Sequence, residues 1–368
     1  MSIPMKIIDV HATPLSIPLS DPKIPWFWGS FSQVIVEVKT DDGLTGYGEA
    51  FGYGVPQAVA AAVNYTLRPL LIGRDAADIS GIADSLFRQT HLFGRYGVTT
   101  FAISGVDIAL WDLAGKRAGL PLCALLGGAA SRDVKAYASL VRYSDTDQMA
   151  ADAEKAAGEG YEMVKLHQTD VESIRKGREA IGGELPMTVD VNCEWTPSHA
   201  AEMAMAMDEH DLLWLEEPVW PPEDYAGLAQ VMDESGVALA AGENACTVHQ
   251  FQLMMSEGAV RYAQPSVIKA GGVSEFVKVA TLAETFNLSL APHSPYFGPG
   301  FLATLHLIAH TRRAEWIEKI YCELEASVFT RPLEFDGGRY TIPEGPGLGL
   351  DVDPLVLREY ALKEQVRK

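Results

Sequence analysis

The sequence predicts an α/β protein in which a parallel β/α barrel follows a smaller α+β module. Two patterns indicate this fold. Short apolar segments alternate with helical segments from residue 134 to residue 321, as strands and helices do in a barrel. The residues before them show strands joined by a tight turn and then several apolar-periodic helices. We therefore expect two differently built parts.

The first module begins with an antiparallel meander. Residues 34–39 and 44–50 are predicted as strands joined by an Asp-Gly turn, and residues 6–19 supply a third strand. Apolar residues then recur at helical spacing until Gly119 and Pro121 end the pattern. The expected helices cover residues 57–72, 78–92 and 101–119.

The barrel is predicted from eight strand segments, the later ones each preceded by a helical segment rich in Ala, Leu or Met. Eight such units favour a closed parallel barrel over an open sheet. The last part of the chain is rich in Gly and Pro, lacks this alternation, and is expected to return to the first module. The expected strands cover residues 134–140, 162–167, 187–191, 213–217, 238–243, 262–266, 289–293 and 316–321.

Composition narrows the function. The chain has 368 residues and a formal net charge of −20, the wrong sign for a protein that follows a nucleic-acid backbone or docks on an anionic membrane. The N-terminal residues lack a basic start followed by an apolar run, and no uninterrupted 18-residue apolar stretch occurs, so a soluble cytoplasmic protein is expected. The four cysteines form no CxxC pair, which indicates neither a disulfide framework nor a thiolate zinc site.

Polar residues stand at or just past the end of seven successive predicted strands, 23 to 27 residues apart. In a barrel, these ends converge on the catalytic mouth. A single polar strand end is more often structural than functional, but seven in phase predict a site. They are Lys165, Asp190, Glu216, Glu243, Ser266, His293 and Glu318.

Three of these residues predict a metal site. Asp190, Glu216 and Glu243 would lie side by side on adjacent strands, and unneutralised carboxylates so close together would be costly. Oxygen ligands favour Mg²⁺ or Mn²⁺ over zinc, and octahedral coordination would leave three positions for substrate and water. Solvated acidic strand ends are the plainer alternative.

The remaining residues suggest acid-base chemistry. Lys165 and His167 alternate past Leu166, so both would point into the barrel, and His293 would stand across the mouth. A divalent ion with open positions can bind a substrate carboxylate and stabilise the dianion formed when the adjacent carbon loses its proton. Two flanking groups then suit proton removal on one side and, on the other, proton return or departure of a leaving group.

The chain resembles the enolase superfamily, in its mandelate racemase and muconate lactonizing enzyme branch. The resemblance rests on ISGVDIALWDLAGK at residues 103–116 and then on VKLH, VDVN, LEEP, GEN, KAGG and APH, in order and spacing. It implies a (β/α)7β modified TIM barrel with an N-terminal capping domain and Mg²⁺ on the three carboxylates. It also implies that Glu318 donates a hydrogen bond to the substrate carboxylate and that Lys165 helps to neutralise the enediolate. The expected divisions are residues 1–125 for the cap, 126–330 for the barrel and 331–368 for a segment returning to the cap.

Two departures from the usual pattern of this branch guide the functional prediction. His167 occupies the second position of a motif that often has Lys at both ends, and Ser266 replaces the Asp that commonly partners the barrel His. A carboxylate neighbour would favour the imidazolium, and Ser266 supplies none, so a symmetrical two-base racemase is disfavoured. We predict dehydration of a small hydroxy acid, such as a sugar acid, to a 2-keto acid, with His167 or Lys165 as base and His293 as acid.

Several alternatives remain open at this point. Racemisation, epimerisation and lactone cycloisomerisation use the same machinery. A non-catalytic metal-binding barrel would explain the missing Asp, but it would not need Lys165, His167, His293 and Glu318 together. A hydrolytic metal barrel would normally recruit His ligands, and the predicted triad contains none.

Substrate contacts are expected from loops around the mouth. The aromatic segment PWFWGS at residues 25–30 is expected to close over the substrate, although packing between domains would explain it almost as well. Arg95 would suit a distal carboxylate or hydroxyl group, or equally a surface salt bridge. The expected partner is a small-molecule carboxylate, and a homo-oligomer, either a dimer or an octamer, is expected by resemblance. The predicted contact residues are Trp26, Trp28, Tyr53, Arg95, Tyr96, Asn192, Ser266 and Tyr296.

Overall fold

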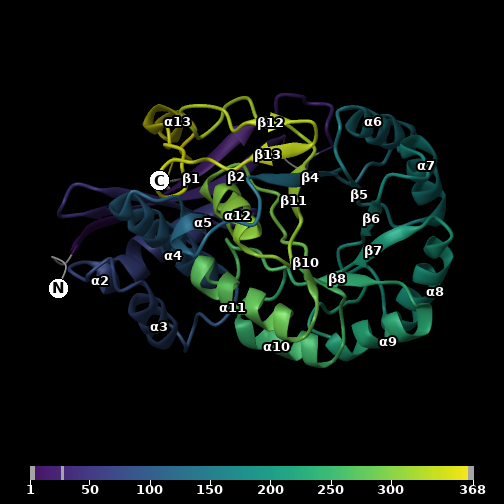
Figure 1. Ribbon diagram of the computed structural model, residues 1–368, viewed down its shortest axis with the longest axis horizontal. Helices are drawn as coiled ribbons and strands as arrows, with labels where there is room; N and C mark the ends of the chain where they lie inside the picture. Colours follow the sequence, from purple (N-terminus) through teal and green to yellow (C-terminus); the bar gives the residue numbers. More distant parts are fainter. Residues whose placement is uncertain (1–4, 26–28, 364–368) are drawn as a thin grey trace, which may run out of the picture.

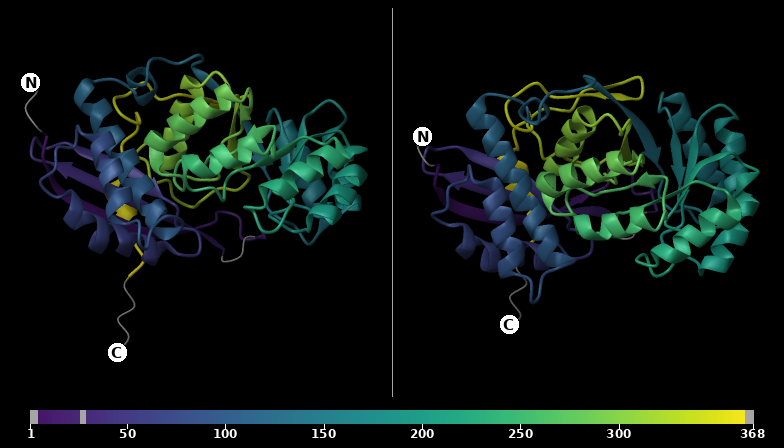
Figure 2. Two further views of the ribbon diagram at one scale, coloured as in Figure 1. Left: turned by 90° about the horizontal axis from the view of Figure 1, so that it is seen from below. Right: turned by 60° about the horizontal axis from the view of Figure 1, so that its bottom comes forward.

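The computed structural model describes residues 5–25 and 29–363. Its N-terminal part consists of a small antiparallel sheet covered by helices, and a ring of helices surrounds a parallel barrel beside it (Figure 1). The C-terminal helix α13 (Pro354–Glu359) lies back against the N-terminal part (Figure 2). The predicted fold class is confirmed.

The N-terminal sheet has the order β1 (Ile7–Pro18), β2 (Ser30–Thr40), β3 (Thr45–Ala50), all antiparallel. Val34 and Val36 face the helices, whereas Ile35 faces α13 and its neighbours. Both faces of the central strand are therefore covered where its three consecutive apolar residues, Val34, Ile35 and Val36, lie.

The helices of this part differ from the prediction in detail. The helix expected at residues 57–72 is divided into α1 (Pro56–Ala61), a π-helical turn η1 (Ala62–Leu67) and α2 (Arg68–Leu71). Helix α3 covers Ile79–Gln89, and α4 begins earlier than predicted, at Val98, and continues to Ala118. The short helix α5 (Leu122–Leu125) then leads to the barrel.

The described residues contain eight parallel barrel strands separated by seven helices. Strand β11 pairs with β4, and a parallel bridge from Leu290 to Ala314 connects the other end of the strand order, so the sheet closes. The strands are β4 (Asp133–Ser139), β5 (Val164–Leu166), β6 (Met187–Asp190), β7 (Leu212–Glu216), β8 (Leu239–Ala241), β9 (Tyr262–Ala263), β10 (Ser289–Leu290) and β11 (Trp316–Ile320). The helices are α6 (Thr146–Gly158), α7 (Val171–Ile181), α8 (Pro197–Asp208), α9 (Tyr225–Ser235), α10 (Val248–Ser256), α11 (Gly272–Thr285) and α12 (Pro299–His310).

The C-terminal segment contacts both parts of the molecule. A hairpin of β12 (Phe335–Asp336) and β13 (Arg339–Thr341) pairs antiparallel with β4 of the barrel, which the sequence did not predict. Beyond α13, Ala361 forms a bridge with Leu15 of β1. The division of the chain at residues 125 and 330 stays a prediction.

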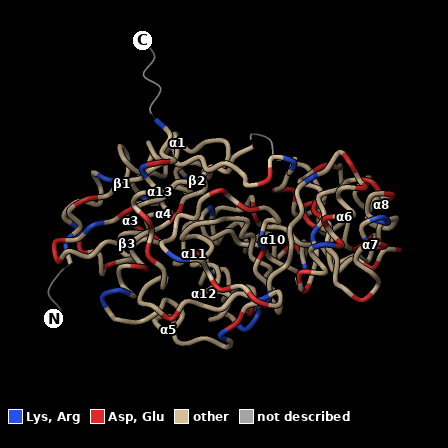
Figure 3. The backbone as a smooth tube through the Cα atoms, turned by 90° about the horizontal axis from the view of Figure 1, so that it is seen from above, with Lys and Arg blue, Asp and Glu red and all other residues tan. Residues whose placement is uncertain are grey.

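Helix α4 is long and apolar enough to cross a membrane by composition, but 78% of its apolar window is buried inside the fold. The burial is that of a core helix. Elsewhere on the chain, acidic and basic residues are interspersed in both parts of the molecule (Figure 3).

A hydrogen-bonded seam joins α4 to α11 of the barrel. The Asp107 carboxylate accepts hydrogen bonds from the Ser274 amide at 3.0 Å and the Ser274 hydroxyl at 2.5 Å, and Trp111 Nε1 donates to the same hydroxyl at 2.9 Å. Gly272 has φ of +85°, and a Cβ there would lie 2.3 Å from Asp107 Oδ1. The KAGG segment is therefore the tight turn that lets α11 approach α4.

Replacing Gly272 with Ala should destabilise the fold by roughly 3 kcal/mol, because the methyl group would meet the Asp107 carboxylate in a backbone conformation that disfavours L-residues. Gly236→Ala is the matched control. Gly236 also has positive φ, +75°, but a Cβ there meets nothing within 4 Å, so a loss of about 1 kcal/mol is expected. Urea denaturation measures the loss of stability in both variants. Equal losses would contradict the close contact between Gly272 and Asp107.

Candidate active site

The polar strand ends meet at one mouth of the barrel. Asp190 and Glu216 are the last residues of adjacent strands and stand opposite each other in register. A cavity of 720 Å³ lies there, between the barrel and the N-terminal part. Its lining includes Lys165, His167, Asp190, Glu243, His293 and Glu318, whereas Glu216 and Ser266 lie fully buried behind it.

Two of the barrel strands end earlier in the structure than the sequence predicted. Strands β9 and β10 are only two residues long, and Ser266 and His293 follow them by three residues each in irregular backbone. The sequence prediction extended both strands to the polar residue. Because these strands are short, Ser266 and His293 lie on the loops at the mouth of the barrel.

The three carboxylates expected to bind a metal are close enough to do so. Asp190, Glu216 and Glu243 each offer an oxygen, and these oxygens lie within 4.8 Å of one another. Burial raises the pKa of Glu216 well above its ordinary value, and neighbouring carboxylates add to the effect although Lys165 opposes it. Three oxygen donors gathered this closely, with Glu216 opposing its own ionisation, fit a hard divalent cation.

Lys165 lies at the centre of these carboxylates. Its Nζ is 2.7 Å from Glu216, 2.9 Å from Glu318 and 3.2 Å from Asp190, and the side chain is 1% exposed. Burial alone would lower the pKa of Lys165, but the carboxylates outweigh it and raise the pKa well above its ordinary value. Lys165 is therefore a fixed cation.

The same cation influences Asp190 and Glu318. Burial would raise the pKa of each carboxyl, but Lys165 outweighs it, together with His167 at Asp190 and with His293 at Glu318, so both pKa values are lowered. In this state Glu318 accepts hydrogen bonds, including one from the Ser294 amide at 3.2 Å.

His167 projects one ring nitrogen into the mouth. Its Nδ1 contacts the Leu140 carbonyl oxygen, which can only accept, so Nδ1 carries a proton. Its Nε2 lies 3.2 Å from Asp190 Oδ2 and is the nitrogen left to exchange a proton in the cavity. Arg142 donates to the His167 carbonyl at 2.8 Å and to the Val191 carbonyl at 3.2 Å, which holds this strand end in place.

His293 faces the mouth from the loop after β10, several strands around the barrel from His167. Its Nε2 lies 2.9 Å from Glu243 Oε2, and its Nδ1 lies 3.3 Å from the Ser266 hydroxyl and 3.4 Å from the Tyr296 hydroxyl. Neutral hydroxyl groups therefore stand where the resemblance would place a carboxylate.

The structure brings some of the predicted substrate contacts to the cavity. Tyr53, Asn192 and Tyr296 line it. Asn192, at φ 49°, also donates to Asp190 Oδ1 at 3.0 Å and so orients that carboxylate. Ser266 reaches the cavity only through His293 and Tyr296.

Two predicted contacts are not brought to the cavity. Arg95 and Tyr96 are exposed and do not line it, because the loop between α3 and α4 turns outward. Trp26 and Trp28 lie outside the described residues, although Pro25 beside them lines the cavity.

The sequence prediction missed Glu49, which lines the cavity from β3 and is 1% exposed. Burial raises the pKa of Glu49 from 4.5 to about 8, and the Gly298 and Gly300 amides only partly oppose the shift. The only signal in the sequence was a charged residue near the end of a predicted strand, which exposed strand residues also show.

The free energy of unfolding of the Glu49→Gln variant, relative to that of wild type, should increase as the pH rises. In the folded state the raised pKa keeps Glu49 protonated, so its contribution to wild-type stability is complete below pH 4.5, falls as the pH rises through about 8, and stays constant at higher pH. The glutamine keeps the acceptor for the Gly300 amide but carries no charge. The stability difference should grow by on the order of 4 kcal/mol between pH 5 and pH 9.

Urea denaturation of both proteins at both pH values measures this difference in unfolding free energy. The contributions of the other titrating groups cancel in the difference, because both proteins share those groups. Glu257→Gln, at an exposed position, is the control and should show no such trend. A pH-independent difference for Glu49→Gln would contradict the argument.

The fold and the site together define a class: a capped β/α barrel with a carboxylate triad and two opposed histidines at its mouth. A family model described as mandelate racemase / muconate lactonizing enzyme, N-terminal domain, matches residues 28–127, and one described as enolase C-terminal domain-like matches residues 148–356. The chain belongs to the enolase superfamily, in its mandelate racemase-like branch, which confirms the resemblance seen in the sequence.

Similar proteins are named for three kinds of reaction: dehydration, cycloisomerisation and racemisation. The chain is 33% identical to arabinonate dehydratase of Saccharolobus solfataricus over 342 residues, covering 90% of this chain and 91% of the relative. It is 34% identical to 3,6-anhydro-alpha-L-galactonate cycloisomerase of Streptomyces coelicolor over 358 residues, covering 94% and 95%. A racemase from Streptomyces coelicolor, solved with bound magnesium, superposes with a TM-score of 0.87 at 32% identity, covering 97% of this chain and 100% of that one.

Proposed function

We propose that the protein is a Mg²⁺-dependent dehydratase that removes the proton next to the carboxylate of a sugar acid and expels a hydroxyl group, forming a 2-keto acid. The observation that supports this most is the asymmetry of the two histidines. The Nε2 of each lies beside a carboxylate, but the Nδ1 of His167 contacts a carbonyl oxygen, which only accepts, whereas the Nδ1 of His293 lies beside a hydroxyl group, which can donate. The dehydratase and cycloisomerase relatives agree with this reaction class.

Asp190, Glu216 and Glu243 would hold the metal, with Mn²⁺ as a possible substitute for Mg²⁺. When bound, the metal supplies a positive charge that holds the substrate carboxylate and stabilises the charge that builds up on it. Lys165 adds a second fixed positive charge at the same place.

His167 is the proposed base. Its Nε2 takes the proton from the carbon next to the carboxylate, and the electron pair passes into the carboxylate to form an enediolate. Lys165 is a poorer base because three carboxylates hold it as a cation. A substrate carboxylate beside Glu318 would favour the protonated form of that residue, which can then donate a hydrogen bond.

His293 is the proposed acid. The Ser266 hydroxyl group can donate to Nδ1 of His293, and in that arrangement Nε2 carries the proton and faces the cavity. His293 gives this proton to the hydroxyl group on the next carbon, which leaves as water, and the resulting enol tautomerises to the 2-keto acid. Ser266 and Tyr296 hold the other ring nitrogen.

The test is proton NMR of the protein with Mg²⁺ in D₂O, against a panel of sugar acids, diacids, lactones and smaller hydroxy acids. Appearance of a 2-keto acid supports dehydration. Deuterium entering unchanged acid, with no water loss, would instead support a racemase or epimerase, and a ring-opened or ring-closed isomer would support a cycloisomerase. Substrate recovered unchanged and without deuterium across the panel would contradict this reaction class.

Assembly and location are part of the proposal. We expect a soluble cytoplasmic homo-oligomer, a dimer or an octamer, that binds neither nucleic acid nor membrane. Leu92 and Phe93, 85% and 64% exposed on the loop between α3 and α4, support an interface between copies. Sedimentation velocity distinguishes these assemblies from a monomer.

A further inference from the structure

One wall of the cavity is built from parts of the chain that are remote in sequence. Glu49, next to last in β3, meets the N-terminus of α12, and its Oε2 accepts a hydrogen bond from the Gly300 amide at 2.9 Å. A Cβ on Gly298 would lie 2.8 Å from the same oxygen, and one on Gly300 would lie 3.0 Å from it. Glycine at both positions therefore lets the backbone approach the carboxyl group.

A second buried polar group stands beside Glu49. Gln33 of β2 is 1% exposed, and neither its Oε1 nor its Nε2 has a hydrogen-bond partner within residues 5–25 and 29–363. Its Oε1 would lie 3.0 Å from a Cβ on Gly298, the position that Glu49 also approaches. An unpaired buried amide costs free energy of about 1–3 kcal/mol, and this one lies next to Glu49 directly behind the cavity lining, which includes Ser32 and Glu49.

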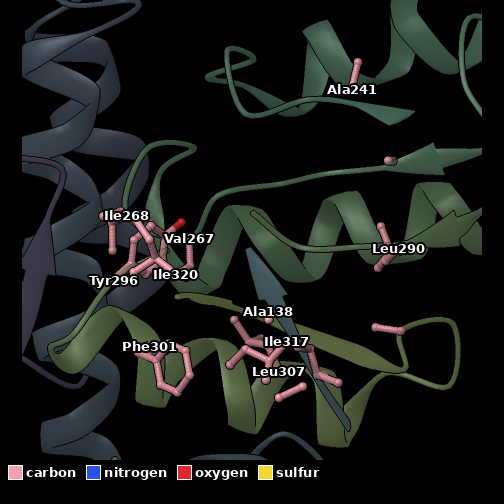
Figure 4. Close-up of a cluster of buried hydrophobic side chains, with 14 of the residues drawn as sticks. Ala138, Ala241, Val267, Ile268, Leu290, Tyr296, Phe301, Leu307, Ile317 and Ile320 are labelled. Atoms are coloured by element: carbon pink, nitrogen blue, oxygen red, sulfur yellow. The ribbon is translucent and has the colours of Figure 1, made fainter. Parts of the chain in front are cut away.

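The surroundings of this pair are otherwise apolar. Ile268 and Tyr296 lie within van der Waals reach of Gly300, and Figure 4 shows them together with Ile320. Only burial and two backbone amides perturb Glu49, and no cation contributes to its pKa. Among the described residues no cation contacts Glu49, since Arg142 and Lys165 line other parts of the cavity, where they contact the His167 carbonyl and the carboxylate cluster. A second carboxylate of a substrate would therefore find no opposite charge beside Glu49, and the Gly300 amide is already engaged by Glu49.

A hydroxyl group fits this corner, because it both donates and accepts hydrogen bonds. Burial raises the pKa of Glu49 to about 8, so near neutral pH the carboxyl group keeps a proton that it can donate. Its Oε2 faces the helix, which leaves the rest of the carboxyl group to the cavity that it lines.

We propose that Glu49, supported by Gln33 at the N-terminus of α12, is a specificity-determining residue that hydrogen-bonds a hydroxyl group on the part of the substrate distant from its carboxylate. It selects polyhydroxy monoacids over diacids. This inference rests on the proposed function, since it takes a sugar acid as the substrate.

The test compares wild type, Glu49→Met, Glu49→Gln and Gln33→Leu on a monoacid and on its analogue lacking one distal hydroxyl group. Glu49→Met, which removes the donor, should lower kcat/KM for the full monoacid by about 10- to 100-fold, mainly through KM, and should change it little for the deoxy analogue. Glu49→Gln, which keeps an acceptor for the Gly300 amide and a donor for the hydroxyl group, should retain most of kcat/KM for the full monoacid. Gln33→Leu should give a smaller change than Glu49→Met in the same direction. Glu37→Gln, on β2 but away from the cavity lining, is the control.

Binding without turnover separates this inference from the proposed function. Acids with a methyl group in place of the reactive hydrogen cannot lose that proton, and calorimetry with Mg²⁺ measures their affinity for each variant. Binding that depends on Glu49 would support the inference even if no 2-keto acid ever formed. In Glu49→Met, equal losses for the full and deoxy acids or no loss for either would overturn it, as would a wild-type preference for diacids, while 2-keto acid production would leave the proposed function standing.

Discussion

His167→Ala should abolish turnover while leaving Mg²⁺ affinity nearly intact. The structure directs His167 Nε2 towards the cavity and holds the ring through the Leu140 carbonyl, so no other described group is placed to take over this position. A positioned general base contributes about 10²- to 10⁴-fold, and removing the proton acceptor for the first step should lower kcat by at least about 10³-fold. Release of 2-keto acid and loss of the α-proton in D₂O both measure the effect.

The control for this variant is His199→Ala. His199 stands on α8 with half of its side chain exposed, next to Glu202 and away from the cavity. Calorimetry of Mg²⁺ binding shows whether the His167 variant keeps its carboxylate triad intact. An unchanged turnover number for His167→Ala would remove this residue from the mechanism and leave Lys165 as the base.

Removal of the divalent cation should abolish turnover reversibly. Chelation is expected to inactivate the protein, and Mg²⁺ or Mn²⁺ should restore it, because only oxygen ligands meet in the triad. Glu216→Gln should weaken Mg²⁺ binding by at least about 100-fold, since the charge lost belongs to the fully buried member of the triad. Because the metal binds the folded state, Mg²⁺ should also raise the Tm of wild type more than that of the variant.

Glu217→Gln is the matched control, one residue further along the chain. Glu217 is also buried, and burial raises its pKa to about 8, but it accepts a hydrogen bond from Asn244 at 2.8 Å and is not part of the triad. It should keep most of the Mg²⁺ affinity. Full activity of wild type after exhaustive chelation would contradict the proposed role of the metal.

The prediction of the fold succeeded where local pattern and architecture agree. The eight barrel strands lie where alternation placed them, because a strand that is buried on both sides must be an apolar run. The even spacing of polar residues predicted that they would meet at one mouth, since one βα unit separates neighbouring strand ends. In the structure, Lys165 contacts both Asp190 and Glu318. Strand lengths were predicted less well, because the last residues predicted for β9 and β10 lie in the loops of the mouth.

Substrate contacts were harder to predict, and the reason is physical. Arg95 was considered as a contact for a distal carboxylate or hydroxyl group of the substrate, or equally as a surface residue, and it is exposed away from the cavity because the direction of its loop depends on how α3 and α4 pack. Glu49 was missed because nothing near it in sequence distinguishes it from an exposed strand residue. It becomes a cavity residue only when α12, about 250 residues later in the chain, closes over it.

The sequence by itself determined the barrel, the seven phased polar positions and the family, because strand period and βα spacing are local properties that one chain displays directly. Only the tertiary structure decided how those groups are charged and oriented. Lys165 is a fixed cation because three carboxylates surround it, and His293 is held by hydroxyl groups because Ser266 and Tyr296 meet beside it. Such properties arise from burial and from contacts between distant segments, and these exist only once the two parts of the molecule have packed together.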